Sequence, residues 1–318
     1  MFIKKMKTAV VFIIYCRPST TEKVFEKIRA AQPPRLYLIA DGPKSSEQNS
    51  VCQQTRAIVE SGIDWNCQLH RVYSKENLGC ARRIQSGLDF VFKYEEQAII
   101  LEDDTLPDFT FFRFCEELLE RYKDSESVFH ICGMNMFPEL LLKEDSYCFS
   151  SINNIWGWAT WARAWNNFDL QMKEWENEDK EKFLENWCVT KSFRKGMKKM
   201  FDIHCNNYDP WTWDYQWIYA CWKNNGVAVL PSRNLVSNIG IGPSATHTIS
   251  ESPISLYPNF LQSMNFPLSH PLTTDRNLTI EKQYKKKEEI PNWRSIKNFV
   301  NNKIVRKFHL LFQTKSHY

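Results

Sequence analysis

The chain has 318 residues, of which 43% are apolar, and its formal net charge is +4. This length and apolar content can bury a substantial core, which excludes general disorder and favours one large α/β domain with appended segments. The charge is small and no RNA- or DNA-binding module is recognised, so we expect no nucleic-acid partner.

The ten cysteines are scattered, with no closely spaced pairs. Neither a zinc knuckle nor a compact disulfide framework is therefore predicted, and a reducing cytoplasm is the favoured compartment.

The N-terminus begins with basic residues, and the apolar run that follows, Thr8–Tyr15, resembles part of an export signal. The run is too short to span a bilayer, and it leads into Arg17-Pro18 without a small-residue cleavage pattern. We interpret it as a buried first strand, as its composition is typical of parallel sheets. Export is the open alternative.

Apolar runs of strand length then alternate with segments of helical period, which indicates strand–helix–strand units around a mainly parallel sheet. The predicted strands are Thr8–Tyr15, Arg35–Ala40, Gln68–Tyr73, Ala98–Leu101, Ser127–Ile131 and Val227–Leu230. The predicted helices are Thr20–Ala31, Ser46–Ser61, Cys80–Tyr94 and Phe109–Tyr122. For the tryptophan-rich remainder we expect helices and loops laid over the same sheet.

The last part of the chain, residues 251–318, is predicted to be a C-terminal extension. Basic residues, among them Lys282–Lys287, interleave with apolar ones, and we expect an amphipathic helix at Trp293–Phe312. Such a helix is suited to an anionic membrane surface. A solvated helix packed on the domain is an equally open alternative.

Polar residues follow the predicted strands at the edge where an open parallel sheet binds its ligands. The most distinctive group is Glu102-Asp103-Asp104, which ends a buried strand where uncompensated charge is costly. Mn²⁺ or Mg²⁺ prefers carboxylate and phosphate oxygens, so one or two carboxylates suffice when a substrate supplies the remaining ligands. Alternatively, Asp104 and Asp108 stabilise the N-terminus of the helix Phe109–Tyr122.

The order of Asp41, the Asn77-Leu78-Gly79 turn and Glu102-Asp103-Asp104 resembles that of GT-A glycosyltransferases. Bacterial family-2-like sugar transferases are the most similar, and the acidic triplet is also similar to that of N-acetylglucosaminyltransferase I. The resemblance covers roughly residues 8–248 and its motifs are short. It implies a GT-A (nucleotide-diphospho-sugar transferase) fold in residues 1–250, with a nucleotide-sugar-binding half, 1–135, and an acceptor half, 136–250.

The resemblance also implies roles for the donor-side residues. Asp104 would bind the metal, with Asp103 near the ribose or the metal and Glu102 near the sugar. Asp41 would accept a hydrogen bond from the base, unless it only forms an Asp-Gly-Pro turn. The remaining donor-side candidates are Arg17, Asn77, Lys75, Arg82 and Arg83, and for the last three a solvated surface is the alternative.

On the acceptor side, an inverting transfer needs a general base, and Asp214 is the candidate. The alternative is a carboxylate that merely begins a helix. His247, after a glycine-rich loop, could complete the metal coordination, or could simply be exposed. Trp156–Trp161 is expected to form the floor of the sugar or acceptor site, with Trp158 in contact, although some of its rings belong to the core.

The implied function is transfer of a hexosyl or N-acetylhexosaminyl group from a nucleotide-sugar donor to a glycan or lipid-linked acceptor hydroxyl. We expect inversion, dependence on a divalent metal, and a part in cell-surface polysaccharide or glycoconjugate synthesis, in the cytoplasm or on the inner face of the membrane. A nucleotidyltransferase is one alternative, but Tyr15–Ser19 lacks the expected glycine-rich loop. A non-catalytic carbohydrate-binding protein is the other.

Overall fold

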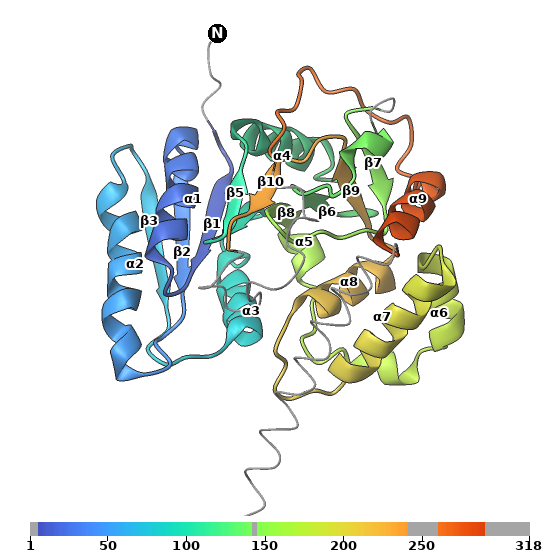
Figure 1. The fold of residues 1–318 in the computed structure, drawn as a ribbon, viewed down its shortest axis with the longest axis horizontal. Coiled ribbons are helices and arrows are strands. Elements are labelled where there is room, and N and C mark those ends of the chain that lie inside the picture. Colours follow the sequence, from blue (N-terminus) through green and yellow to red (C-terminus); the bar gives the residue numbers. More distant parts are fainter. Residues whose placement is uncertain (1–5, 142–144, 241–259, 290–318) are drawn as a thin grey trace, which may run out of the picture.

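The computed structural model describes residues 6–141, 145–240 and 260–289 (Figure 1). Its strands are β1 (Ala9–Ile14), β2 (Arg35–Ala40), β3 (Gln68–Tyr73), β4 (Gln97–Glu102), β5 (Thr105–Pro107), β6 (Val128–Cys132), β7 (Tyr147–Ser150), β8 (Trp158–Trp161), β9 (Val227–Pro231) and β10 (Val236–Asn238). Within these residues an eight-stranded mixed sheet has the order β3-β2-β1-β4-β8-β6-β9-β7, and β5 pairs with β10 in a small second sheet.

The α-helices are α1 (Pro18–Ala31), α2 (Asn49–Gly62), α3 (Cys80–Val91), α4 (Phe109–Arg121), α5 (Ala162–Trp165), α6 (Lys180–Trp187), α7 (Lys191–His204), α8 (Asp214–Lys223) and α9 (Leu278–Glu288). Some of these α-helices lie against the sheet, and others, α6 to α8 among them, form a group below its second half (Figure 1). Short 3₁₀ helices lie at Ser46–Gln48, Pro138–Leu141 and Lys173–Asn177. The predicted α/β class, with a mainly parallel sheet flanked by helices, is confirmed.

The first half of the sheet follows the predicted pattern. Every residue of β1 is buried, and β1 pairs in parallel with β2 on one side and β4 on the other. The chain thus adds β2 and β3 to one side of β1 and then crosses back to place β4 on the opposite side. Reversals of this kind leave a crevice for ligands beyond the carboxyl ends of the two strands.

The register places the two critical strand ends side by side. Ile13 of β1 lies opposite Glu102 of β4. The turn after β1, which carries Tyr15 and Arg17, therefore starts next to the acidic triplet, although about ninety residues separate them in the chain.

The second half corrects our prediction of helices and loops. β8 runs antiparallel between β4 and β6, and β9 and β7 extend the sheet beyond them. All four residues of β8 are buried. A buried strand of only four residues has no alternation of polar and apolar side chains, so its sequence does not distinguish it from part of a buried helix.

The described part of the expected C-terminal extension packs on the domain. Tyr284 of α9 is fully buried, and the buried Glu281 pairs with Arg276 and accepts a hydrogen bond from the Ser151 amide. The predicted helix Trp293–Phe312 lies outside the described residues.

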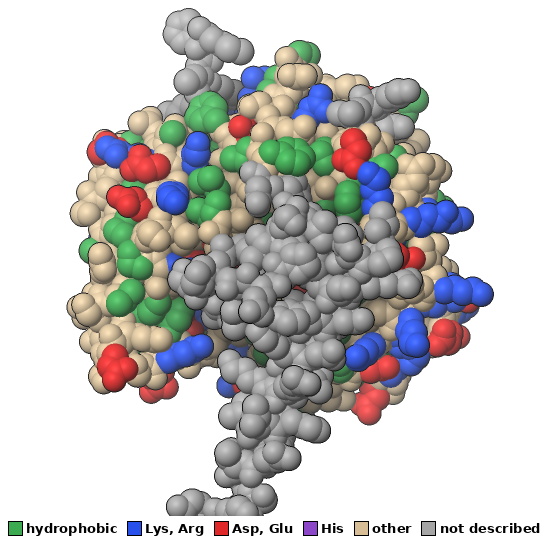
Figure 2. Space-filling model, in the orientation of Figure 1, with side chains coloured by type: hydrophobic (Ala, Val, Ile, Leu, Met, Phe, Trp, Pro, Cys, Tyr) green, Lys and Arg blue, Asp and Glu red, His purple; other side chains and the backbone are tan. Residues whose placement is uncertain are grey.

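Basic side chains gather over α7 and α9 on the face drawn in Figure 2, with acidic ones among them. Lys287 pairs with Glu139, and Lys180 and Lys198 pair with Asp202.

Across the residues described, no helix combines the length and apolarity needed to cross a membrane.

Candidate functional site

The acidic triplet lies in a tight turn between β4 and β5. The Thr105 hydroxyl closes this turn, because it accepts from the Glu102 amide at 2.8 Å and donates to the Glu102 carbonyl at 3.0 Å. The Ile239 amide, which follows β10, donates to the Asp104 carbonyl at 2.8 Å. The backbone that presents the carboxylates is therefore fixed on both sides.

The helix that follows does not begin at Asp104. Asp108 caps α4, since its carboxylate accepts a hydrogen bond from the Thr110 amide at 2.8 Å. β5 separates Asp104 from that helix. Asp104 and Asp108 were both considered as acids at the N-terminus of this helix, and Asp108 occupies that position while Asp104 does not.

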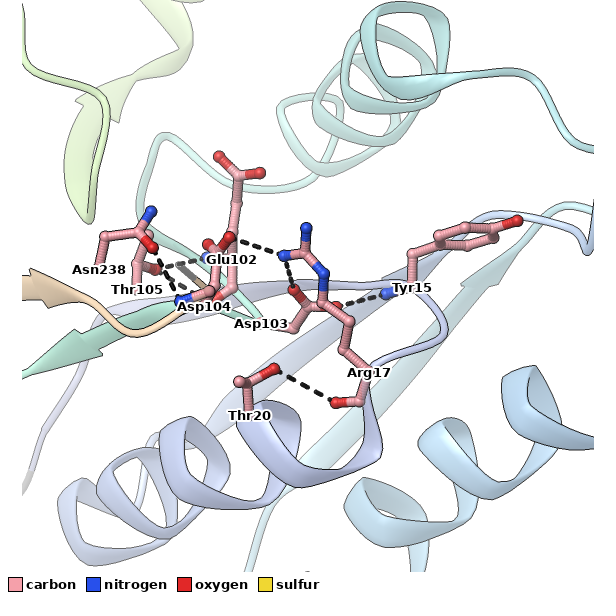
Figure 3. Close-up of polar contacts among 9 residues, drawn as sticks. Tyr15, Arg17, Thr20, Glu102, Asp103, Asp104, Thr105 and Asn238 are labelled. Carbon is pink, nitrogen blue, oxygen red and sulfur yellow. Dashed lines mark hydrogen bonds and ion pairs between the residues drawn. The ribbon is translucent and has the colours of Figure 1, made fainter. Parts of the chain in front are cut away.

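Arg17 reaches across from the turn after β1 to the triplet (Figure 3). Its Nη1 lies 3.0 Å from Asp103 Oδ1 and 2.7 Å from Asp104 Oδ2. The Tyr15 amide donates to the other oxygen of Asp103 at 2.8 Å. Asp103, only 5% exposed, thus ties the ends of β1 and β4 together. Arg17 lies in the predicted site, but its guanidinium binds carboxylates.

The triplet holds more negative charge than Arg17 balances. Burial, and then the charges of Asp104 and Asp103, raise the pKa of Glu102 to about 8. Burial also raises the pKa of Asp103 to about 7, against the opposing effect of Arg17. A carboxyl with so high a pKa ionises readily only if more positive charge is brought to it.

Asp214 and Cys80 bring two more elements to this region. Asp214 is the first residue of α8, accepts a hydrogen bond from the Thr212 hydroxyl, and has its pKa raised by burial. Although solvent reaches Cys80, burial and then the charges of Glu102, Asp214, Asp104 and Asp41 raise the pKa of its thiol. Cys80 is the first residue of α3, directly after the Asn77-Leu78-Gly79 turn.

Sequence reasoning did not identify Cys80 as part of the site. The available signal was its position directly after the Asn77-Leu78-Gly79 turn, at the carboxyl edge of the sheet. Gly240 was also missed. A side chain there would collide with the Asp104 carboxylate, so a glycine is needed for the close approach.

Asp41 supports the turn that begins α3. Its carboxylate accepts hydrogen bonds from the amides of Gly42, Leu78 and Gly79 at 2.9 to 3.1 Å. The Asn77 side chain adds a bond to the Gly42 carbonyl at 2.7 Å. These contacts favour the turn interpretation of Asp41, since the backbone uses much of its acceptor capacity.

The other basic candidates diverge. Lys75 is exposed, and Arg82 donates to the Tyr208 carbonyl, so Arg82 links α3 to the segment before α8. Arg83 is buried and donates to the Val72 carbonyl at 2.7 Å. Arg83 therefore stabilises the fold by joining α3 to β3.

Trp158 requires a correction, because we expected it to contact the ligand. Its side chain is 1% exposed and stacks between His130 and Trp213, with ring centroids 5.2 and 5.4 Å away. Gly157 likewise serves close packing against Val236. Trp213 directly precedes Asp214, so the aromatic cluster supports the start of α8 and acts on the site only through it.

Glu102 and Asp104 carry carboxylate oxygens, which are the ligands that Mn²⁺ and Mg²⁺ prefer. His247, the second predicted ligand, lies outside the described residues. In the ranges that the structure describes, no three His, Cys, Asp or Glu side chains converge closely enough to hold a metal by themselves. The surplus charge of Glu102 and Asp104 nevertheless suits a hard ion whose remaining ligands are phosphate oxygens.

No protein-family model matches the chain, and no curated protein matches it. Solved structures with similar parts include UDP-glucose pyrophosphorylase complexed with UDP-glucose, at 10% identity and a TM-score of 0.32, over 51% of this chain and 79% of that one. Glycosyltransferase GlyE of Streptococcus pneumoniae TIGR4 aligns at 12% identity and a TM-score of 0.30, over 70% of this chain but 45% of its own. HddC from Yersinia pseudotuberculosis aligns at 12% identity and a TM-score of 0.29, over 50% and 80%. These TM-scores are too low to support an argument, so the description of the fold depends on the strand order of this chain alone.

Proposed function

We propose that the protein is a glycosyltransferase of the GT-A type, which transfers a sugar with inversion from a nucleotide-sugar donor to an acceptor hydroxyl. The observation that carries this proposal is the acidic turn Glu102-Asp103-Asp104, which lies beyond the reversal point between β1 and β4 and is bridged by Arg17. An inverting transfer also needs a base for the acceptor, which attacks from the opposite face, and we assign that role to Asp214 at the start of α8.

Asp104 and Glu102 would hold a divalent metal ion, Mn²⁺ or Mg²⁺, which when bound would neutralise the charge that develops on the departing nucleoside diphosphate. Arg17 is placed to assist. Its guanidinium already contacts the Asp104 carboxylate, and a guanidinium is a group that suits phosphate oxygens.

Asp214 would accept the proton of the acceptor hydroxyl as that oxygen attacks the anomeric carbon. Its raised pKa makes it a stronger base than an ordinary aspartate. The start of α8 rests on buried aromatic rings, so the carboxylate is held by a rigid support.

A screen of UDP-, GDP- and TDP-linked hexoses and N-acetylhexosamines with Mn²⁺, followed by release of nucleoside diphosphate, tests the proposal. We expect one donor class to be consumed, at least by slow hydrolysis. Asp214→Asn should reduce kcat for transfer by about 10²–10⁴-fold and leave the Kd for the donor near the wild-type value.

Asp209→Asn is the matched control, because Asp209 is an exposed acid a few residues before Asp214, and it should retain full turnover. Full activity of Asp214→Asn would exclude Asp214 as the base. Release of pyrophosphate from a nucleoside triphosphate, with no consumption of nucleotide-sugars, would instead identify a nucleotidyltransferase.

A further inference from the structure

Cys16 and Cys52 meet beside the candidate site. Cys16 directly precedes Arg17 in the turn after β1, and Cys52 lies in the first turn of α2. Both are reduced, and their sulfur atoms are 2.8 Å apart. A disulfide bond measures about 2.03–2.05 Å, so the fold holds the two thiols within roughly 1 Å of bonding distance.

The surroundings of the two thiols differ. Cys52 is 3% exposed, whereas Cys16 is half-buried and is the sulfur that a small solute reaches first. The hollow between them, which Tyr15 and Asp41 also line, is too narrow to hold a water molecule. Nothing therefore separates the two sulfurs.

The backbone at Cys16 is also unusual. Its φ angle is +43°, a left-handed conformation that costs free energy for any residue with a side chain. This conformation persists because the surrounding structure holds it.

We propose that Cys16 and Cys52 form an oxidation site, at which a hydroperoxide joins the two thiols in an intramolecular disulfide. The Cys16 thiolate attacks the outer peroxide oxygen, the O–O bond breaks, and an alcohol or water leaves, so that Cys16 becomes a sulfenic acid. The Cys52 sulfur then attacks the Cys16 sulfur, and the oxygen departs as water with the Cys52 proton. In sum, two thiols and one hydroperoxide give one disulfide, one alcohol and one water.

The order of these steps follows from the environment of Cys52. Burial, together with the contact to Cys16, raises the pKa of Cys52 to about 12. Cys52 therefore keeps its proton near neutral pH and does not react first with the peroxide. It loses this proton to the departing oxygen as its sulfur bonds to Cys16.

The new bond would restrain the turn that carries Tyr15 and Arg17. These two residues hold Asp103 and Asp104, so the oxidation state would act on the supports of the acidic triplet. The oxidation site itself rests on the two sulfurs and does not depend on the proposed function.

Treatment of the purified full-length protein with one equivalent of hydrogen peroxide, followed by digestion without reductant and mass spectrometry, tests the proposal. We expect one linked peptide pair containing Cys16 and Cys52, an intact mass lower by two hydrogen atoms, and reversal by dithiothreitol. In Cys52→Ser the reaction should stop at a sulfenic acid on Cys16, which dimedone traps.

Cys67→Ser is the matched control, because Cys67 is as exposed as Cys16 and precedes the nearby β3, and this variant should still form the bond. Oxidation of wild-type Cys16 to sulfenic or sulfinic acid without the linked pair would overturn the proposal. The wild-type peptide map decides the matter even if a serine variant does not fold.

Discussion

The acidic residues at the end of β4 have unusual pKa values. Glu102 and Asp103 are buried acids with pKa values of about 8 and about 7, because burial and neighbouring carboxylates outweigh the single nearby guanidinium. Both values lie above the ordinary ones of 4.5 and 3.8. Between the ordinary and the raised pKa, the folded protein binds more protons than the unfolded chain.

Stability should therefore fall as pH rises. We expect the free energy of unfolding to decrease by roughly several kcal/mol between about pH 5 and pH 8, measured by urea denaturation without divalent metal. Glu102→Gln should remove most of this decrease. The control Glu120→Gln, at an exposed position, should keep it. A wild-type protein that becomes more stable over this interval would show that the triplet ionises freely.

The residue pattern predicted only part of the site. Strand-end position identified Arg17, Glu102 and Asp104, because parallel strands present their carboxyl ends at one edge of a sheet. It did not show that Arg17 would bind the acids themselves, since that contact depends on a side-chain path across the β1–β4 boundary. Gly240 was missed because only the folded chain places it against the Asp104 carboxylate.

The turn that begins α3 depends on Asp41. Asp41→Ala removes the acceptor for the Leu78 and Gly79 amides and should lower the free energy of unfolding by about 1–3 kcal/mol in urea denaturation. Asp64→Ala is the control, because its ion pair with Arg29 lies on the surface and its loss should leave stability nearly unchanged. Unchanged stability of Asp41→Ala, combined with weaker nucleotide binding, would favour contact with the base.

The first four long strands were predicted within a residue or so of their ends. β1, β2 and β4 are mostly apolar runs bounded by polar turns, whereas β3 alternates polar and apolar residues. In the second half of the sheet β6 and β9 were also predicted, whereas β7 and β8 were not. Trp158–Trp161 is short and rich in aromatic residues, and the same composition suits a ligand-binding wall. Long-range pairing with β4 and β6, which local sequence does not encode, places this segment in the core.

For the whole molecule, α9 should be part of the folding unit. Glu281→Ala leaves Arg276 without its partner in a buried setting and should cost about 3–5 kcal/mol, as measured by urea denaturation. Lys287→Ala removes an exposed ion pair to Glu139 and should cost less than about 1 kcal/mol. If both variants were equally stable, residues 260–289 would be an accessory to an independently stable domain.

Titration of nucleoside diphosphates into the protein, with and without Mn²⁺, tests most directly whether the acids after β4 form a metal and diphosphate site. We predict that one nucleoside diphosphate binds only with Mn²⁺, and that Asp104→Asn weakens this binding by about 10- to 100-fold. Asp108→Asn, which alters the cap of α4 and a contact with Ser263, should leave the affinity unchanged. Binding that needs no metal, or equal affinity in Asp104→Asn and the wild type, would contradict the account.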